Sequence, residues 1–173
     1  MRSLSDTLQR LQRYRNIPVM DAAPTRLTQL EIASANPGNL LGWYYAPENG
    51  DRSGPLALVV VLHGCTQTVA GYDAGSGWSK LADEFGFAVL FPEQSRQNNP
   101  NLCFNWFSES NIERDRGEVR SIREMIDTMV SDHGIDPARV FITGLSAGGA
   151  MANAMLAAYP EVFSGGAIIA GLP

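Results

Sequence analysis

Positive charge is scarce in this sequence, because 13 Lys and Arg residues stand against 18 Asp and Glu residues and the formal net charge is −5. No broad basic field is available to attract nucleic acid or an anionic membrane surface. We therefore expect neither nucleic acid nor a membrane among the partners. Hydrophobic residues make up 45% of the chain and charged residues 18%, a balance typical of a globular domain rather than a disordered segment.

Long apolar runs are missing as well. No stretch is long enough for the apolar region of a secretory signal, and none approaches the roughly 20 residues that a membrane-spanning helix needs. From the sequence alone we expect a soluble, cytoplasmic chain without an export signal. Cysteine is also rare, since only Cys65 and Cys103 occur. Two cysteines are too few for a disulfide scaffold, and neither belongs to a pair spaced like metal ligands, so we predict no metal site.

The pattern of the chain divides it near residue 27. Residues 1–26 predict an amphipathic helix, Met1 to Tyr14, with Leu4, Leu8 and Leu11 at helical spacing, and then a linker broken by prolines. Residues 27–173 alternate between apolar runs and amphipathic segments, which predicts one α/β core with a mostly parallel sheet.

Two short runs at the start of this core are joined by Asn36-Pro37-Gly38-Asn39, strong turn chemistry that predicts an antiparallel hairpin. The later apolar runs lack polar alternation, as expected of strands covered on both faces. The predicted strands are 27–33, 40–46, 56–62, 87–91, 140–143 and 167–170; the predicted helices are 78–85, 115–133 and 147–158; and 92–111 is a long loop.

Gly144-Leu145-Ser146-Ala147-Gly148 matches the pattern G-x-S-x-G between a predicted strand and a predicted helix. A nucleophilic serine must stand on a sharp turn that exposes its hydroxyl, and small neighbours allow that turn without a Cβ clash. The start of the following helix would also favour a developing oxyanion. An ordinary glycine-rich turn is the alternative, but the strand, the helix and a second motif favour Ser146 as a nucleophile.

The second motif is His63-Gly64-Cys65-Thr66-Gln67, at the carboxyl end of the predicted strand 56–62. A motif of this kind supplies an oxyanion donor in α/β-hydrolases. We predict that the donors are the backbone N–H groups of Cys65 and Ala147. His63 belongs to the motif itself, so we expect it to shape the loop rather than act as the catalytic base. His133 ends a predicted helix, where we expect it to cap.

The run from Leu58 to Pro173 contains, in order, L-H-G-C-T-Q, G-W-S-K-L-A-D, F-P-E-Q, C-F-N-W-F, D-P-A-R-V and G-L-S-A-G-G-A-M. In these motifs the chain resembles the poly(3-hydroxybutyrate) depolymerase-like esterases, an α/β-hydrolase family that includes feruloyl and acetylxylan esterases. The resemblance implies the N-terminal portion of that fold. It also implies carboxylic ester hydrolysis through an acyl-enzyme on Ser146, with oxyanion donors at Cys65 and Ala147 and no metal or organic cofactor. It does not choose the ester.

In the family that the chain resembles, the segment from Cys103 to Trp106 lies beside the active site. Trp106 could form an aromatic wall for the substrate or simply pack, and Gln67 is a second candidate for substrate contact. Cys65 and Cys103 could form a disulfide, which by the chain-entropy argument would contribute about 4 kcal/mol. A disulfide would imply an oxidising compartment, so the absent export signal leaves the location open, with an extracellular one possible by resemblance.

A complete triad would require an acid and a histidine after the nucleophile in this fold. No histidine follows Ser146, and the only later acidic residue, Glu161, ends the nucleophile helix. We therefore expect either a fragment of a longer enzyme, completed by a C-terminal segment, or a non-catalytic remnant that binds an ester or a partner. A serine peptidase is a further alternative, because the nucleophile motif alone does not separate esters from amides.

Overall fold

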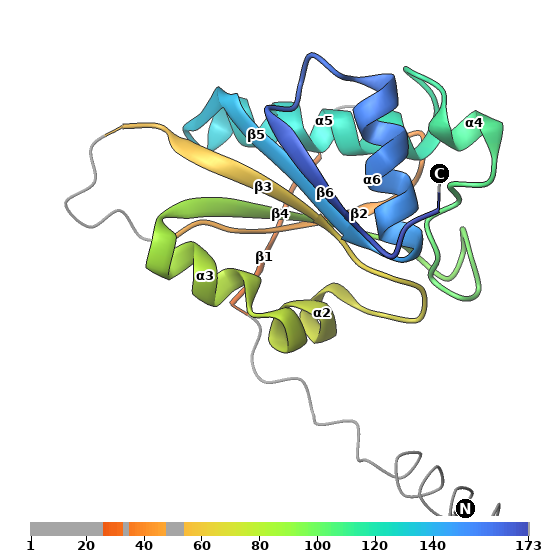
Figure 1. Cartoon of the computed structure of the whole chain (residues 1–173), viewed down its shortest axis with the longest axis horizontal. Helices are drawn as coiled ribbons and strands as arrows, with labels where there is room; N and C mark the ends of the chain where they lie inside the picture. Colours follow the sequence, from red (N-terminus) through yellow and green to blue (C-terminus); the bar gives the residue numbers. More distant parts are fainter. Residues whose placement is uncertain (1–25, 33–34, 48–53, 173) are drawn as a thin grey trace, which may run out of the picture.

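The computed structural model describes residues 26–32, 35–47 and 54–172. The predicted N-terminal helix and most of the linker after it lie outside these residues. The described part is a six-stranded sheet with helices on both faces (Figure 1). The strands are β1 (Thr28–Gln29), β2 (Leu41–Tyr45), β3 (Leu56–Leu62), β4 (Phe87–Glu93), β5 (Ile135–Leu145) and β6 (Gly165–Ile169); the helices are α2 (Val69–Ser76), α3 (Trp78–Phe85), α4 (Glu109–Ile112), α5 (Gly117–Asp132) and α6 (Ala147–Ala158).

The strand order is β1-β2-β4-β3-β5-β6. β1 pairs with β2, and β2 with β4, in antiparallel fashion, whereas β4, β3, β5 and β6 are parallel to one another. The predicted hairpin and the predicted parallel sheet are both confirmed. Parallel neighbours all end at one edge of the sheet, so His63 after β3, Gln94 after β4 and Ser146 after β5 are brought to the same edge.

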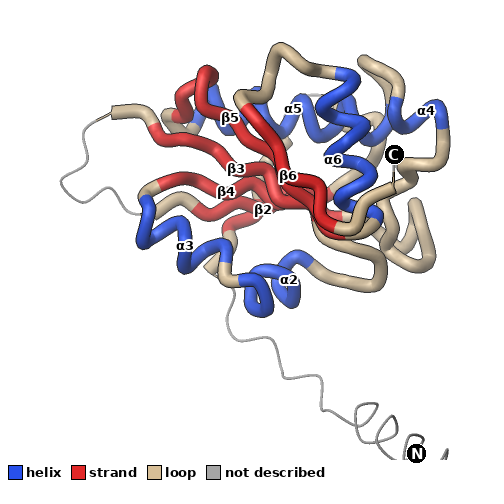
Figure 2. The backbone as a smooth tube through the Cα atoms, viewed as in Figure 1, coloured by secondary structure: helices blue, strands red, loops and turns tan. Residues whose placement is uncertain are grey.

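Figure 2 shows helices on both sides of the sheet. Two apolar clusters fill the space between the sheet and these helices. Alternate residues of β3 separate cleanly, because Leu58, Val60 and Leu62 join the larger cluster with α5 and α6, while Val61 joins the smaller one with α2 and α3. All four of these side chains are completely buried. The Leu and Val run of β3 is therefore covered on both faces, as its lack of polar alternation predicts.

β5 differs from its prediction in two ways. It is 11 residues long and begins at Ile135, because Ile135 pairs with Leu56 ahead of an irregularity in the register between β3 and β5. Its second face is also covered unevenly, because Thr143 is only 5% exposed whereas its neighbour on that face, Phe141, is not buried. Val140 and Ile142 are buried beneath the helices, but Phe141 is 38% exposed on the opposite face. The prediction of a strand covered on both faces is therefore wrong at Phe141 and holds for the other three residues of the predicted strand 140–143.

Helix α2 is absent from the sequence-based expectation, and α4 begins inside the predicted loop 92–111 and ends one residue beyond it. α2 begins at the cap Thr68, whose side chain accepts a hydrogen bond from Gly71 N–H, and ends at Gly77, which adopts a left-handed conformation with φ 79°. These are ordinary helix start and stop signals. Its eight residues carry little apolar periodicity, so the pattern of hydrophobic residues gave no sign of it. In the part of the chain that is described, no helix is both long and apolar enough to cross a membrane.

Candidate active site

Ser146 forms a sharp turn between the end of β5 and the start of α6. Its backbone lies at φ 55° and ψ −118°, a strained conformation for a residue that has a Cβ, and the residue is exposed. The Ser146 N–H donates to Ile169 O at 2.9 Å, and Ser146 O accepts from Ala150 N–H at 2.9 Å. The strand-turn-helix placement and exposure of Ser146 agree with the sequence-based prediction.

Gly144 and Gly148 are required by packing on the two sides of this turn. A Cβ added to Gly148 would lie 2.3 Å from Leu62 O and 2.5 Å from His63 O. A Cβ added to Gly144 would lie 2.2 Å from Gly148 O. Real Cβ atoms do not approach backbone atoms so closely. The start of α6 can therefore press against the end of β3 only because these positions lack side chains.

The loop from His63 to Gln67 runs directly beside the serine. A Cβ built on Gly64 would lie 3.6 Å from Ser146 Cβ. Gly64 N–H donates to Gln67 Oε1 at 2.7 Å, so this amide oxygen already has a structural partner inside the loop. A substrate contact by Gln67 stays a prediction. Ser146 thus lies between the start of α6 at Ala147 and the loop that contains Cys65, and an oxyanion hole formed by their N–H groups stays a prediction.

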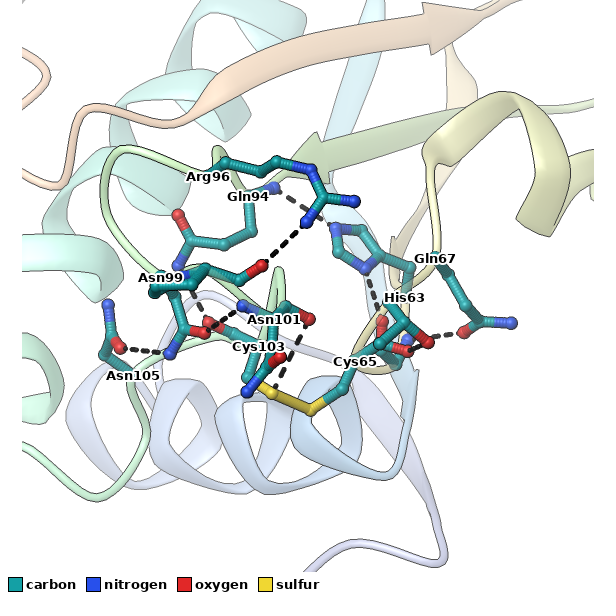
Figure 3. Close-up of a disulfide and its surroundings, with 12 residues drawn as sticks. His63, Cys65, Gln67, Gln94, Arg96, Asn99, Asn101, Cys103 and Asn105 are labelled. Carbon is teal, nitrogen blue, oxygen red and sulfur yellow. Dashed lines mark hydrogen bonds between the residues drawn. A yellow bond between two sulfur atoms is a disulfide. The ribbon is translucent and has the colours of Figure 1, made fainter.

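Cys65 and Cys103 form a disulfide, with their Cα atoms 4.2 Å apart (Figure 3). This separation lies within the limit of about 7 Å that a disulfide requires. The bond joins the loop after β3 to the long loop after β4. A hydrogen bond from Thr66 N–H to Asn101 O, 2.7 Å long, connects the same two loops. The long loop after β4 is therefore tied to the loop after β3 at two consecutive residues, Cys65 and Thr66.

His63 is completely buried, and both of its ring nitrogens are engaged. Nε2 accepts from Gln94 N–H at 3.1 Å, which places the proton on Nδ1, 2.8 Å from Gly64 O. Burial lowers the pKa of the imidazole below its ordinary value, although the Gly64 carbonyl and the negative Glu93 act in the opposite direction. His63 is thus a neutral bridge that shapes the loop. It has no free nitrogen to take a proton from Ser146.

His133 lies at the other end of the sheet. It caps α5, and its ring centroid is 4.3 Å from that of Tyr44. The next residue, Gly134, accepts a hydrogen bond from Leu56 N–H at the first residue of β3, whereas His63 follows the last. These are the only two histidines of the sequence. Neither is placed to act as the base for Ser146.

Glu161 is not placed as a triad acid either. Its carboxylate pairs with Arg114, which lowers the pKa of Glu161, and the side chains of both residues are 53% exposed. Trp106 is partly buried, packs against the larger cluster and contacts the exposed Phe107 edge to face, with ring centroids 5.9 Å apart. Packing therefore accounts for part of the Trp106 surface, and its role as a substrate wall stays a prediction.

The sequence did not predict a role for two residues near the site, Glu118 and Gln94, although Gln94 belongs to the motif F-P-E-Q. Glu118 is buried in the first turn of α5, and Gln94 is buried directly after β4. Burial raises the pKa of the Glu118 carboxyl, and the N–H donors of Asn105 and Gln94 offset that rise only in part. A glutamate in the first turn of a helix is ordinarily a solvated residue that complements the helix dipole. The sequence therefore carried no signal that distinguished it.

An apolar groove lies on the uncovered face of β5 and β6. Phe141, Thr143, Ala167 and Ile169 line it, together with Trp78 of α3. Its volume is about 420 Å³. β6 is the last strand of the sheet in the described structure, and its Ile168 and Ile169 are 44% and 49% exposed. The side of Ser146 next to β6 is thus open and apolar, in contrast to the side next to Cys65.

Comparison with known proteins places this geometry among esterases. The family described as Esterase PHB depolymerase matches residues 42–172. A poly(3-hydroxyalkanoate) depolymerase C of Paucimonas lemoignei is 48% identical over 157 residues, which cover 91% of this chain and 37% of the relative. A feruloyl esterase B of Talaromyces funiculosus is 33% identical over 158 residues, covering 91% of this chain and 43% of the relative.

The structure of an acetyl xylan esterase from Aspergillus awamori superposes with a TM-score of 0.76 at 31% identity, covering 86% of this chain and 53% of the esterase. The fold is therefore the N-terminal portion of an α/β-hydrolase. The chain spans about half the length of that esterase and less than half of the other two proteins.

Proposed function

Because the chain belongs to the Esterase PHB depolymerase family, we propose that it forms the nucleophile half of a serine carboxylic ester hydrolase. One observation carries the proposal: Ser146 stands exposed at a strained elbow, directly beside Gly64 of the loop that contains Cys65. An unrelated glycine-rich turn would need neither the strained serine nor the loop packed against it. The relatives named above are esterases or polyester depolymerases, which supports ester hydrolysis as the reaction class.

In the proposed reaction, Ser146 Oγ attacks the ester carbonyl carbon while a base takes its proton. The negative charge that forms on the carbonyl oxygen is stabilised by the backbone N–H groups of Cys65 and Ala147. The carbon–oxygen bond to the alcohol then breaks, and the alcohol leaves with the proton returned by the base. Water hydrolyses the resulting acyl-enzyme by the same route. This sequence of steps requires no metal or organic cofactor.

We further propose that the base and its carboxylate partner come from a segment beyond β6, in the same polypeptide or in a complementing chain. His63 and His133 are both occupied elsewhere, so an imidazole must be supplied to Ser146. The exposed edge of β6 and the apolar groove beside it support this arrangement, because further strands and helices would cover both surfaces.

A chimera tests the proposal directly. Residues 1–172 are joined to the segment that follows the matching region in the Paucimonas lemoignei depolymerase, and hydrolysis of nitrophenyl acetate is measured. We expect turnover that falls by about three orders of magnitude or more in the Ser146→Ala variant of the chimera. A chimera that is folded by circular dichroism but no faster than its Ser146→Ala variant would contradict the proposed function.

The same chimera can narrow the substrate class. Its rates on 3-hydroxybutyrate oligomers, acetylated xylan, feruloylated sugars and a peptide amide are compared under one set of conditions. Because esters are the substrates named for its relatives, we expect an ester to be preferred over the amide. Comparable kcat/KM on the amide would identify a peptidase instead.

A further inference from the structure

Glu118 is a buried carboxylate that the proposed chemistry does not use. It is 1% exposed, and in the described part of the chain its hydrogen bonds come only from neutral donors. Asn105 N–H donates to Oε2 at 2.8 Å, Asn105 Nδ2 donates to Oε1 at 2.7 Å, and Gln94 Nε2 donates to Oε1 at 2.7 Å. A buried charge without a cationic partner is expensive and is retained only where several donors satisfy it.

The donors are the two ends of one loop. Gln94 follows β4, and Asn105 lies 11 positions later, so the Glu118 carboxylate closes residues 94–105 into a ring against α5. The amide group of Gln94 is itself fully used. Its Nε2 also donates to Cys103 O at 3.1 Å, and its Oε1 accepts from Ser95 N–H and Asn98 Nδ2. Rotation of the Gln94 side chain away from Glu118 would break all four of these hydrogen bonds.

The loop 94–105 in turn holds the loop 63–67 at three points (Figure 3). Gln94 N–H donates to His63 Nε2, Asn101 O accepts from Thr66 N–H, and Cys103 is bonded to Cys65. These three tethers surround the Cys65 backbone. The position of its N–H is therefore determined by a loop whose own shape depends on Glu118.

We propose that Glu118 is a positioning residue for the oxyanion donor Cys65, acting through Gln94 and the loop 94–105. This inference rests on the proposed function, because Cys65 matters to catalysis only if Ser146 attacks an ester. The carboxylate does not touch the substrate. It keeps the donor aimed at the site where the negative charge develops, which is how preorganised N–H groups lower a barrier.

The variant Glu118→Gln tests this at a single atom. It keeps one acceptor oxygen but places an NH2 group where Oε2 accepted the Asn105 N–H, so two donors face each other. Asp127→Asn is the matched control, because Asp127 lies on the same helix, is exposed and, among the described residues, pairs only with Arg123. Asn105→Ala is a milder second variant that removes one of the three donors, in case Glu118→Gln does not fold.

The first readout is the 15N NMR spectrum of the histidine ring nitrogens in the 15N-histidine-labelled chain. His133, at the far end of the sheet, is an internal reference that general loosening of the fold would move as well. We expect His63 to show a single tautomer protonated at Nδ1 in the unmodified chain and in Asp127→Asn. In Glu118→Gln we expect a mixture of tautomers for His63 with His133 unchanged, and in Asn105→Ala a smaller shift in the same direction.

The second readout is catalysis by the chimera described above. We expect Glu118→Gln to lower kcat about 10-fold to 100-fold with KM nearly unchanged, because removal of an oxyanion donor outright lowers kcat about 10² to 10³-fold. A folded Glu118→Gln variant with an unchanged His63 spectrum, or with an unchanged kcat, overturns the inference. If the chimera is inactive altogether, the proposed function fails, while the His63 spectrum still decides whether Glu118 anchors the loop.

Discussion

The two sides of Ser146 are built in opposite ways. On the side of β3, a disulfide, two hydrogen bonds between loops and a buried carboxylate fix the backbone around Cys65. On the side of β6, the sheet ends in two exposed isoleucines, Ile168 and Ile169, and an open apolar groove. Under the proposed function, the side of β3 would stabilise the developing charge, and the groups that transfer protons would lie on the side of β6.

On the β3 side of Ser146, which we call the fixed side, removing the disulfide should lower the free energy of unfolding most. The bond closes a sequence separation of 38 residues, and by the chain-entropy argument its loss should lower the free energy of unfolding by about 4 kcal/mol. The measurement is urea unfolding of a Cys65→Ser/Cys103→Ser double variant beside the oxidised chain. An equal midpoint and slope for the two proteins would mean that the hydrogen bonds alone hold this side.

Gly148→Ala should have the next largest effect. The new Cβ would lie 2.3 Å from Leu62 O, and since the start of α6 cannot retreat without moving Ser146, we expect a loss of about 3 kcal/mol in unfolding free energy. Gly75→Ala is the matched control, because a Cβ there meets nothing within 4 Å and Gly75 lies within a helix. The control should be neutral or slightly stabilising. Similar midpoints for both variants would show that the elbow is not tightly packed.

The pH dependence of the fixed side should come partly from His63. Its pKa is lowered by burial, so the neutral ring favours the folded state above the ordinary value of 6.5, and that advantage is lost as the pH falls through the lowered pKa. Relative to a His63→Asn variant, the chain should lose at most about 1.4 kcal/mol of unfolding free energy per pH unit on acidification below 6.5. A difference that does not change with pH would mean that His63 keeps its ordinary pKa.

A substitution on the β6 side of Ser146 should change the free energy of unfolding least but should clearly change self-association. Ile169→Lys places a charge on the exposed edge, which should reduce self-association while changing the free energy of unfolding by less than about 0.5 kcal/mol. Phe85→Lys on α3 is the control, since Phe85 is 66% exposed but does not line the groove beside β6. Sedimentation velocity of the three proteins distinguishes them. If Phe85→Lys reduces self-association and Ile169→Lys does not, the exposed edge of β6 is not the surface through which the chain associates.

The sequence predicts features whose causes lie close together along the chain, and it fails where distant segments decide burial. The elbow at Ser146 was predictable because its cause is local: small residues flank a serine between a β-branched strand and a helix. The double burial of β3 was predictable from its continuous apolar run. The exposure of Phe141 was not, because burial of that face depends on what else packs there. Glu118 was not predictable for the same reason, since its burial is created by residues 94–105 folding over it.

One comparison of hydrolysis rates tests most directly whether a base for Ser146 exists within this chain. Residues 1–173 contain the serine and the proposed oxyanion donors but no histidine free to act as a base. We predict that the purified chain hydrolyses nitrophenyl acetate at least about 10³-fold more slowly than an ordinary kcat of about 10 s⁻¹. Its Ser146→Ala variant should lie within about tenfold of that low rate, since a serine without its base adds little. Turnover at an ordinary enzymatic rate that disappears in Ser146→Ala would contradict the account, because a base would then have to exist within these residues.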